Sequence, residues 1–412
     1  MSELTFVQSL NGGVYEIHVN GPMVDDWPEN ERLIWRIEYS ALHELNGTLT
    51  ASVDDLERAL ARHTSTDPVT RLDLFREYAR SVHTLWSKYG LDRPGLSLSR
   101  LRLGEKLAFR GEIIRGLAEK DVLFAARMAP TVKFVTESRT PTALDFMPLM
   151  CPRETDDFWR VALTLPSLYS IWHTVFLGSR GAGALITQEP PSPSVRAVVR
   201  GADAPGWKQM RRILDADGRP TLPDIPDHKN PKLLERRDVA RFILDPYDIQ
   251  TRGRTVSDVH LYAHGIVGDT AAETFTIKLP YPGKLGMLIP AGTVKVRNLD
   301  FEDAARKVES RARRRPVLIW MTCCNAAGQV GRLAFSQAVE MSHTGAVVIA
   351  PRTEVESSRA QLLAAAFYRH WVPGVSPAHA FLAAQLERLT VGDPFPIFYN
   401  FLGSHQEQGG QT

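Results

Sequence analysis

The stretch VLIWMTCCNAAG, residues 317–328, decides the fold class of this chain. Its first five residues are apolar and include β-branched and aromatic types, a pattern typical of a fully buried strand. The strand runs into Thr322, the adjacent pair Cys323 and Cys324, and a turn of small residues. In open parallel sheets, ligands bind at the carboxyl ends of the strands, so the end of this strand is a candidate reactive site.

A second unit of this kind lies upstream in VHLYAHGIVGD, residues 259–269. There a short apolar strand ends at His264, and Gly265 follows directly. We expect the two strands to be neighbours, so that an imidazole and a thiol meet at one edge of the sheet. Nucleophilic catalysis by cysteine requires this pair of groups. His260 lies on the same strand but deeper in the sheet, and we assign it no catalytic role.

Beyond residue 94, strand-like and helical patterns alternate along the chain. This alternation predicts an α/β three-layer sandwich with a mostly parallel central sheet over residues 95–412. The expected elements are, in chain order, helix 103–121, strands 131–135, 158–163, 195–199, 259–263 and 275–279, helix 299–312, strand 317–321, helix 329–343, strand 346–350, helices 358–370 and 377–389, and strand 395–401. Residues 188–231 hold eight of the 27 prolines and predict an irregular surface insertion.

Residues 1–94 predict a separate, small α+β module with a structural or docking role. A ligand sensor is the alternative role for it. The expected elements are strands 4–7 and 14–19 around the turn Asn11-Gly12-Gly13, followed by helices 52–61 and 72–89. Ser52 and Asp55 resemble a capping box that opens the first of these helices.

The composition limits the classes of function. Of the 412 residues, 43% are hydrophobic and 23% charged, and the net charge is +2, which gives no support to direct nucleic-acid binding. Three cysteines without a CxxC pair support neither a disulfide framework nor a zinc site. The sequence has no recognisable signal peptide and no membrane-spanning run, so we expect a cytoplasmic protein that needs no metal or cofactor.

Several stretches together resemble the CHAT domain, a family within the caspase and separase group of cysteine peptidases. The likeness runs in the family's order over roughly residues 95–404. It rests on segments 133–150 and 161–172, the His-Gly of DVHLYAHG, the strand and nucleophile of VLIWMTCC, and the closing strand and helices at 345–371 and 376–389. Two departures stand out. The family commonly has Trp-Glu where this chain has residues 142–145, and the glycine after the nucleophile falls one place late, at Gly328.

The resemblance implies roles for the groups at the sheet edge. Cys324 takes the position of the nucleophile and His264 that of the base that accepts its proton. The backbone N–H groups of Gly265 and Cys324 would hold the oxyanion. Strand alternation predicts that Cys323 points into the core instead. Cys323 as the nucleophile, and a structural role for both thiols, are the alternatives.

The resemblance also implies a protein substrate that binds as an extended strand beside the closing strand. Arg352, Glu354 and Asp269 are the candidate substrate-binding residues. The first hypothesis for function is limited proteolysis of a partner protein in a regulated bacterial defence or signalling system, switched on by an activating protein or ligand. The second is a catalytically silent, caspase-like protein-interaction scaffold, and the third is a cysteine hydrolase of non-peptide substrates.

Overall fold

The computed structural model divides the chain into two compact units. The first comprises Met1–Ser179 and Ala378–Phe398, and the second comprises Arg180–Pro377 and Tyr399–Thr412. The predicted domain boundary after residue 94 stays a prediction. The structure describes residues 4–62, 68–130, 132–136, 149–150, 171–174, 194–200, 206–216, 255–267, 274–282, 288–297, 318–324, 329–330, 333–334, 347–351, 355–393 and 395–402.

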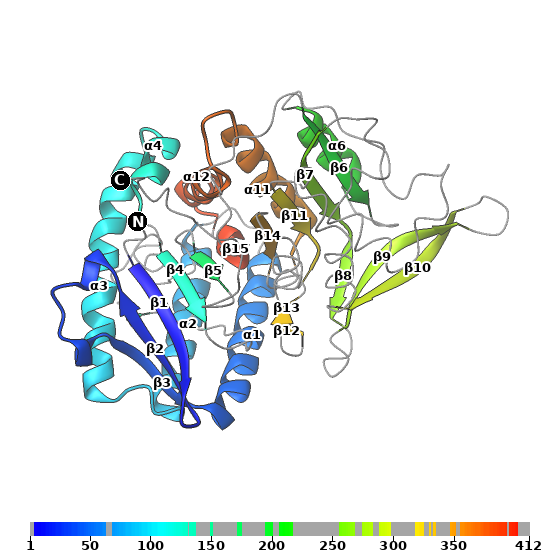
Figure 1. The fold of residues 1–412 in the computed structure, drawn as a ribbon. Coiled ribbons are helices and arrows are strands. Elements are labelled where there is room, and N and C mark those ends of the chain that lie inside the picture. Colours follow the sequence, from blue (N-terminus) through cyan, green and yellow to red (C-terminus); the bar gives the residue numbers. More distant parts are fainter. Residues whose placement is uncertain are drawn as a thin grey trace. The chain divides into compact units, whose positions relative to one another are not determined.

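In the first unit, strands pair in the order β3-β2-β1-β4-β5 (Figure 1). Their bounds are β1 Leu4–Asn11, β2 Val14–Asn20, β3 Leu33–Glu38, β4 Val132–Thr136 and β5 Ile171–Thr174. The antiparallel pair β1–β2 is the predicted hairpin, and Gly12 and Gly13 at its turn have positive φ, as a tight hairpin turn requires. β1, β4 and β5 run parallel, whereas β3 is antiparallel to β2.

Long helices accompany these strands. The helices of the first unit are α1 Tyr39–Arg62, α2 Pro68–Lys88, α3 Pro94–Ala118, α4 Val122–Met128 and α12 Pro377–Thr390, with short 3-10 helices η1 Pro22–Val24, η2 Glu29–Glu31 and η7 Phe395–Phe398. The predicted cap at Ser52 is wrong, because this residue lies in the interior of α1. Its hydroxyl donates to the carbonyl oxygen of Thr48 at 2.9 Å, the back-bonding that serine makes inside a helix.

In the second unit, strands pair in the order β15-β14-β11-β7-β6. Their bounds are β6 Ser194–Arg200, β7 Thr255–Tyr262, β11 Leu318–Thr322, β14 Val347–Pro351 and β15 Tyr399–Leu402. The pairs β6–β7, β7–β11 and β11–β14 are parallel, and β15 is antiparallel to β14. An α/β chain with parallel strands is therefore confirmed, while the caspase-like three-layer arrangement stays a prediction.

The other described elements of the second unit are smaller. They are α6 Trp207–Asp215, α11 Ser357–His370, the antiparallel strands β8 His264–Val267, β9 Thr274–Pro282 and β10 Leu288–Arg297, and the short pair β12 Gln329–Val330 and β13 Leu333–Ala334. β6 and α6 both fall within residues 188–231, and Met210 and Leu214 of α6 are fully buried. This proline-rich range is therefore not irregular throughout, and the strand expected at 195–199 is confirmed.

Two other predicted elements fall differently, and two lie outside the described residues. Residues 329–334 contain β12 and β13 rather than the start of the predicted helix 329–343. The predicted last strand is split into η7 and β15, because Pro396 has no N–H to donate to a ladder. Strand 158–163 and helix 299–312 lie outside the described residues.

One face of β7 and β11 packs against α11. The ring of Trp320 on β11 lies 4.8 Å from that of Phe367 on α11 and 5.9 Å from that of Tyr399 on β15. The register pairs Trp320 with His260 of β7, and their rings stack with 6.2 Å between centroids. Side chains two residues along each strand share this face, so Thr322 also points toward α11.

Candidate active site

β7 and β11 are adjacent parallel strands that end at the same edge of their sheet. The register pairs Tyr262, the last residue of β7, with Thr322, the last residue of β11. The N–H of Ala263 then donates to the carbonyl oxygen of Thr322 at 3.4 Å. His264 and Cys324 each come two residues beyond this last pair. The two strands are thus neighbours, as the sequence predicts, and their extensions begin side by side.

The two adjacent thiols lie in different environments. Cys323 is fully buried, and its Sγ lies 3.9 Å from the carbonyl oxygen of Leu261, whereas Cys324 is partly exposed, with its Sγ 4.0 Å from the carbonyl oxygen of Val355. Burial, followed by the neighbouring Cys324, raises the pKa of the Cys323 thiol, and a backbone hydrogen bond from Ala263 only partly opposes this. Because the thiolate is the reactive form, Cys324 is the better placed nucleophile.

The remaining predicted site residues are described less fully. His264 opens β8, where it pairs with Lys278, and Gly265 pairs with Ile277. The structure describes the backbone at His264 and not its imidazole. The substrate-binding candidates Arg352, Glu354 and Asp269 lie outside the described residues, as does loop 325–328. The catalytic, oxyanion and substrate-binding roles stay predictions.

A second imidazole, which the sequence analysis set aside, lies within the sheet. His260 is fully buried, with Nδ1 3.1 Å from the hydroxyl of Tyr368 and Nε2 3.3 Å from the hydroxyl of Thr322. Burial, followed by the positive charge of Arg196, lowers the pKa of His260 to about 3, against the opposite effect of Asp258. At neutral pH this imidazole is uncharged and already hydrogen-bonded on both nitrogens. In the sequence, the one signal for a contact between His260 and Thr322 is that both residues lie on the same face of neighbouring strands.

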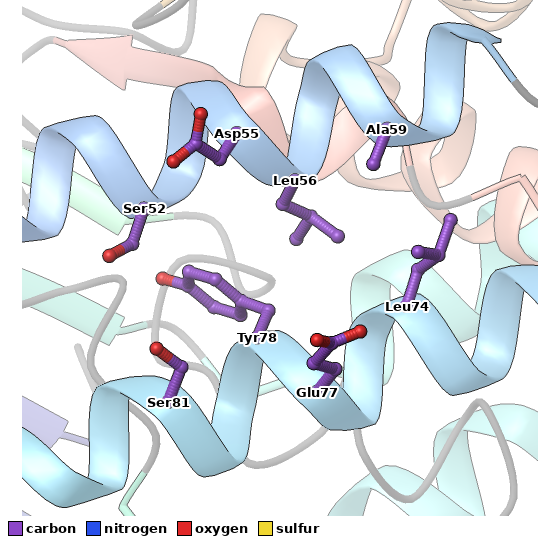
Figure 2. A pocket seen from close by; sticks show the side chains of 8 residues that line it. All are labelled: Ser52, Asp55, Leu56, Ala59, Leu74, Glu77, Tyr78 and Ser81. Atoms are coloured by element: carbon purple, nitrogen blue, oxygen red, sulfur yellow. The ribbon is translucent and has the colours of Figure 1, made fainter.

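A groove of about 250 Å³ lies in the first unit, between α1 and α2 (Figure 2). Tyr78 extends from α2 toward α1, Leu56 points down from α1, and the exposed carboxylates of Asp55 and Glu77 complete the rim. The eight lining residues include no cysteine, histidine or lysine. The groove therefore offers no thiol–imidazole pair and is not a candidate for the same chemistry.

The described residues form neither a metal site nor a membrane span. Among the described residues, no group of three or more histidine, cysteine, aspartate or glutamate side chains is arranged to hold a metal ion. Within the same part of the chain, no helix has the length and apolar character that a membrane span needs.

A comparison with solved structures finds a remote similarity. No protein-family model and no curated protein sequence matches the chain. The crystal structure of the Arg-specific cysteine proteinase gingipain R is similar with a TM-score of 0.39 and 10% sequence identity. The match covers 72% of this chain and 66% of that proteinase, which is just under two thirds of its length. Similarity at this level assigns no family, so the function must be argued from the residues themselves.

Proposed function

We propose that this chain is a cysteine endopeptidase in which Cys324 is the nucleophile and His264 the general base. The strongest support is that β7 and β11 end together at one edge of the sheet. His264 and Cys324 each follow two residues after the last register pair, Tyr262 and Thr322. The partial exposure of Cys324, beside the fully buried Cys323, selects between the thiols. These features support the pairing of an accessible sulfur with the histidine that follows the neighbouring strand.

The proposed reaction proceeds through a thioester. His264 takes the proton of the Cys324 thiol, and the thiolate attacks the peptide carbonyl carbon, forming a C–S bond. The N–H groups of Gly265 and Cys324 bind the oxyanion, which Gly265 favours because the substrate can approach a backbone that has no Cβ. The C–N bond then breaks as the imidazolium donates its proton to the leaving amine. Water hydrolyses the thioester and restores the thiol.

The finer parts of the proposal follow from the resemblance to the CHAT domain. The second unit would be a caspase-like sandwich, with the substrate added as an extended strand and with Arg352, Glu354 and Asp269 near it. The protein would work in the cytoplasm, where its cysteines stay reduced, and would cut a partner protein in a bacterial defence or signalling system after activation.

Mapping of cleavage products tests this proposal. A peptide library made from a digested proteome is incubated with the wild-type protein, Cys324→Ala, Cys323→Ala and His264→Ala. We expect new termini that depend on Cys324 and His264 and persist in Cys323→Ala. New termini produced equally by Cys324→Ala would contradict the assignment. Cleavage by none of the four proteins would favour the interaction-scaffold hypothesis.

A further inference from the structure

A continuous set of buried polar contacts leads from β6 to the end of β11. Arg196 of β6 pairs with Asp258 of β7, with 2.5 Å from Nε to Oδ2, and both side chains are fully buried. The hydroxyl of Tyr368 on α11 donates to the same carboxylate at 3.5 Å, and the guanidinium carbon of Arg196 lies 4.1 Å from the centroid of that ring. His260 follows, with its Nδ1 at 3.1 Å from the hydroxyl of Tyr368.

The set ends at Thr322, one residue before the thiol pair. Its Oγ1 lies 3.3 Å from Nε2 of His260 and accepts a hydrogen bond from the indole N–H of Trp320 at 3.2 Å. The hydroxyl of a threonine has one hydrogen to donate and two lone pairs. Trp320 occupies one of the two lone pairs, so the direction of the bond between Thr322 and His260 is set by the tautomer of His260.

The bond from Tyr368 to Asp258 is compatible with one tautomer of His260. The hydroxyl of Tyr368 gives its hydrogen to Asp258, so it must accept from Nδ1–H of His260. Nε2 is then the unprotonated nitrogen, and it accepts the hydrogen of Thr322. The opposite tautomer would direct the hydroxyl of Tyr368 to Nδ1 and remove its bond to the carboxylate. With Tyr368 donating to Asp258, each hydrogen bond of the set points from Thr322 toward the carboxylate.

The segment just before α11 contacts the thiol. The carbonyl oxygen of Val355, just before α11, lies 4.0 Å from Sγ of Cys324, and Tyr368 sits further along this helix. Gln361 of α11 donates to the hydroxyl of Tyr262 at 3.1 Å, at the end of β7. α11 thus contacts the end of β7, and the residue two positions before it lies beside the sulfur of Cys324.

We propose that Thr322, oriented by His260 and Tyr368, is a positioning residue that keeps Cys324 turned outward and Cys323 turned inward. Its hydroxyl fixes the last residue of β11 to the face that packs on α11. The next side chain, Cys323, must then enter the opposite face, and Cys324 emerges in the following turn. This role deepens the proposed function and rests on it for its catalytic meaning, since it explains which of two adjacent thiols is presented.

The test is the selectivity with which iodoacetamide alkylates the two thiols in the folded protein, read by peptide mass spectrometry. Thr322→Val keeps the branched shape and removes the hydroxyl, and Thr322→Ser keeps the hydroxyl. A buried hydrogen bond contributes about 1 kcal/mol, so we expect the ratio of Cys324 to Cys323 alkylation to fall roughly fivefold in Thr322→Val. In Thr322→Ser the ratio should stay within about twofold of wild type, because the hydrogen bond remains.

Two tyrosine variants separate positioning from general loss of stability. Tyr368→Phe removes the next hydroxyl of the set and should lower the same ratio. Tyr15→Phe removes a buried hydroxyl in the first unit, where it donates to Gln8, and should leave the ratio unchanged. Unchanged selectivity in both Thr322→Val and Tyr368→Phe would overturn the proposal, as would an equal fall in Tyr15→Phe. Alkylation needs no peptidase activity, so failure of the proposed function would not imitate either result.

Discussion

Each unit buries an arginine over an aromatic ring, but the two arginines end in different surroundings. In the first unit, Arg100 lies 4.3 Å from the ring centroid of Trp86 and donates to the carbonyl oxygens of Ile34, at 3.0 Å, and Leu91. Burial lowers its pKa to about 10, although the charge of Asp92 opposes this. Arg100 therefore joins α3, β3 and a loop through neutral acceptors.

In the second unit the arginine is paired with a carboxylate. Arg196 donates to Asp258 and to the carbonyl oxygen of Leu214, each at 2.5 Å. The carboxylate of Asp258 accepts a further hydrogen bond from Tyr368, and the contacts continue from Tyr368 to His260 and Thr322. Arg100, bound by carbonyl oxygens, joins only the segments next to it. Arg196, bound by a carboxylate, is the first member of a series of hydrogen bonds that extends to Thr322. We infer that the second arrangement serves the strand end that carries the thiols.

The largest expected difference between the units comes from removing the carboxylate. Asp258→Asn should lower the free energy of unfolding of the second unit by about 3–5 kcal/mol, because it leaves the buried charge of Arg196 without a partner. Urea unfolding, followed by hydrogen exchange at β6 and β7, measures the effect. A loss below about 1 kcal/mol would show that Arg196 does not depend on this pair.

A smaller effect is expected at the other arginine. Arg100→Met keeps an apolar stem over Trp86 but leaves the carbonyl groups of Ile34 and Leu91 without their donor. We expect a loss of about 2–4 kcal/mol in the first unit. The ratio of Cys324 to Cys323 alkylation should not change in this variant. A change would show that the effect of Arg100 extends beyond the first unit.

The smallest expected effect is the pH dependence of the stability of the second unit, which contains His260. The folded protein keeps His260 neutral, with its pKa lowered to about 3, while the unfolded chain binds a proton at the ordinary pKa of about 6.5. Stability should therefore be fully present above pH 6.5 and fall as the pH is lowered toward 3, by up to about 1.4 kcal/mol per pH unit. Urea midpoints at pH 7, 6 and 5 measure it. His260→Gln should have a shallower slope, and an equal slope would contradict the assignment.

The sequence predicted the elements whose pattern is local. Five consecutive apolar residues indicated the buried strand β11, and alternation placed Cys323 in the core, where it is fully buried. The polar set could not be predicted in this way. Arg196 and Asp258 are 62 residues apart and Tyr368 is 110 from Asp258, so no periodicity links them. The cap predicted at Ser52 was wrong for another reason. A serine followed three residues later by an acidic residue occurs inside helices as well as at their starts.

The account depends most on Cys324 being a nucleophile activated by His264. The direct measurement is the rate at which a peptide chloromethyl ketone modifies each thiol at pH 7, located by tandem mass spectrometry, in wild type and in His264→Ala. We predict an adduct on Cys324 and none on Cys323, formed at least about tenfold more slowly in His264→Ala, since the imidazole supplies the thiolate. A rate that does not depend on His264, or an adduct on Cys323 in the folded protein, would contradict the account.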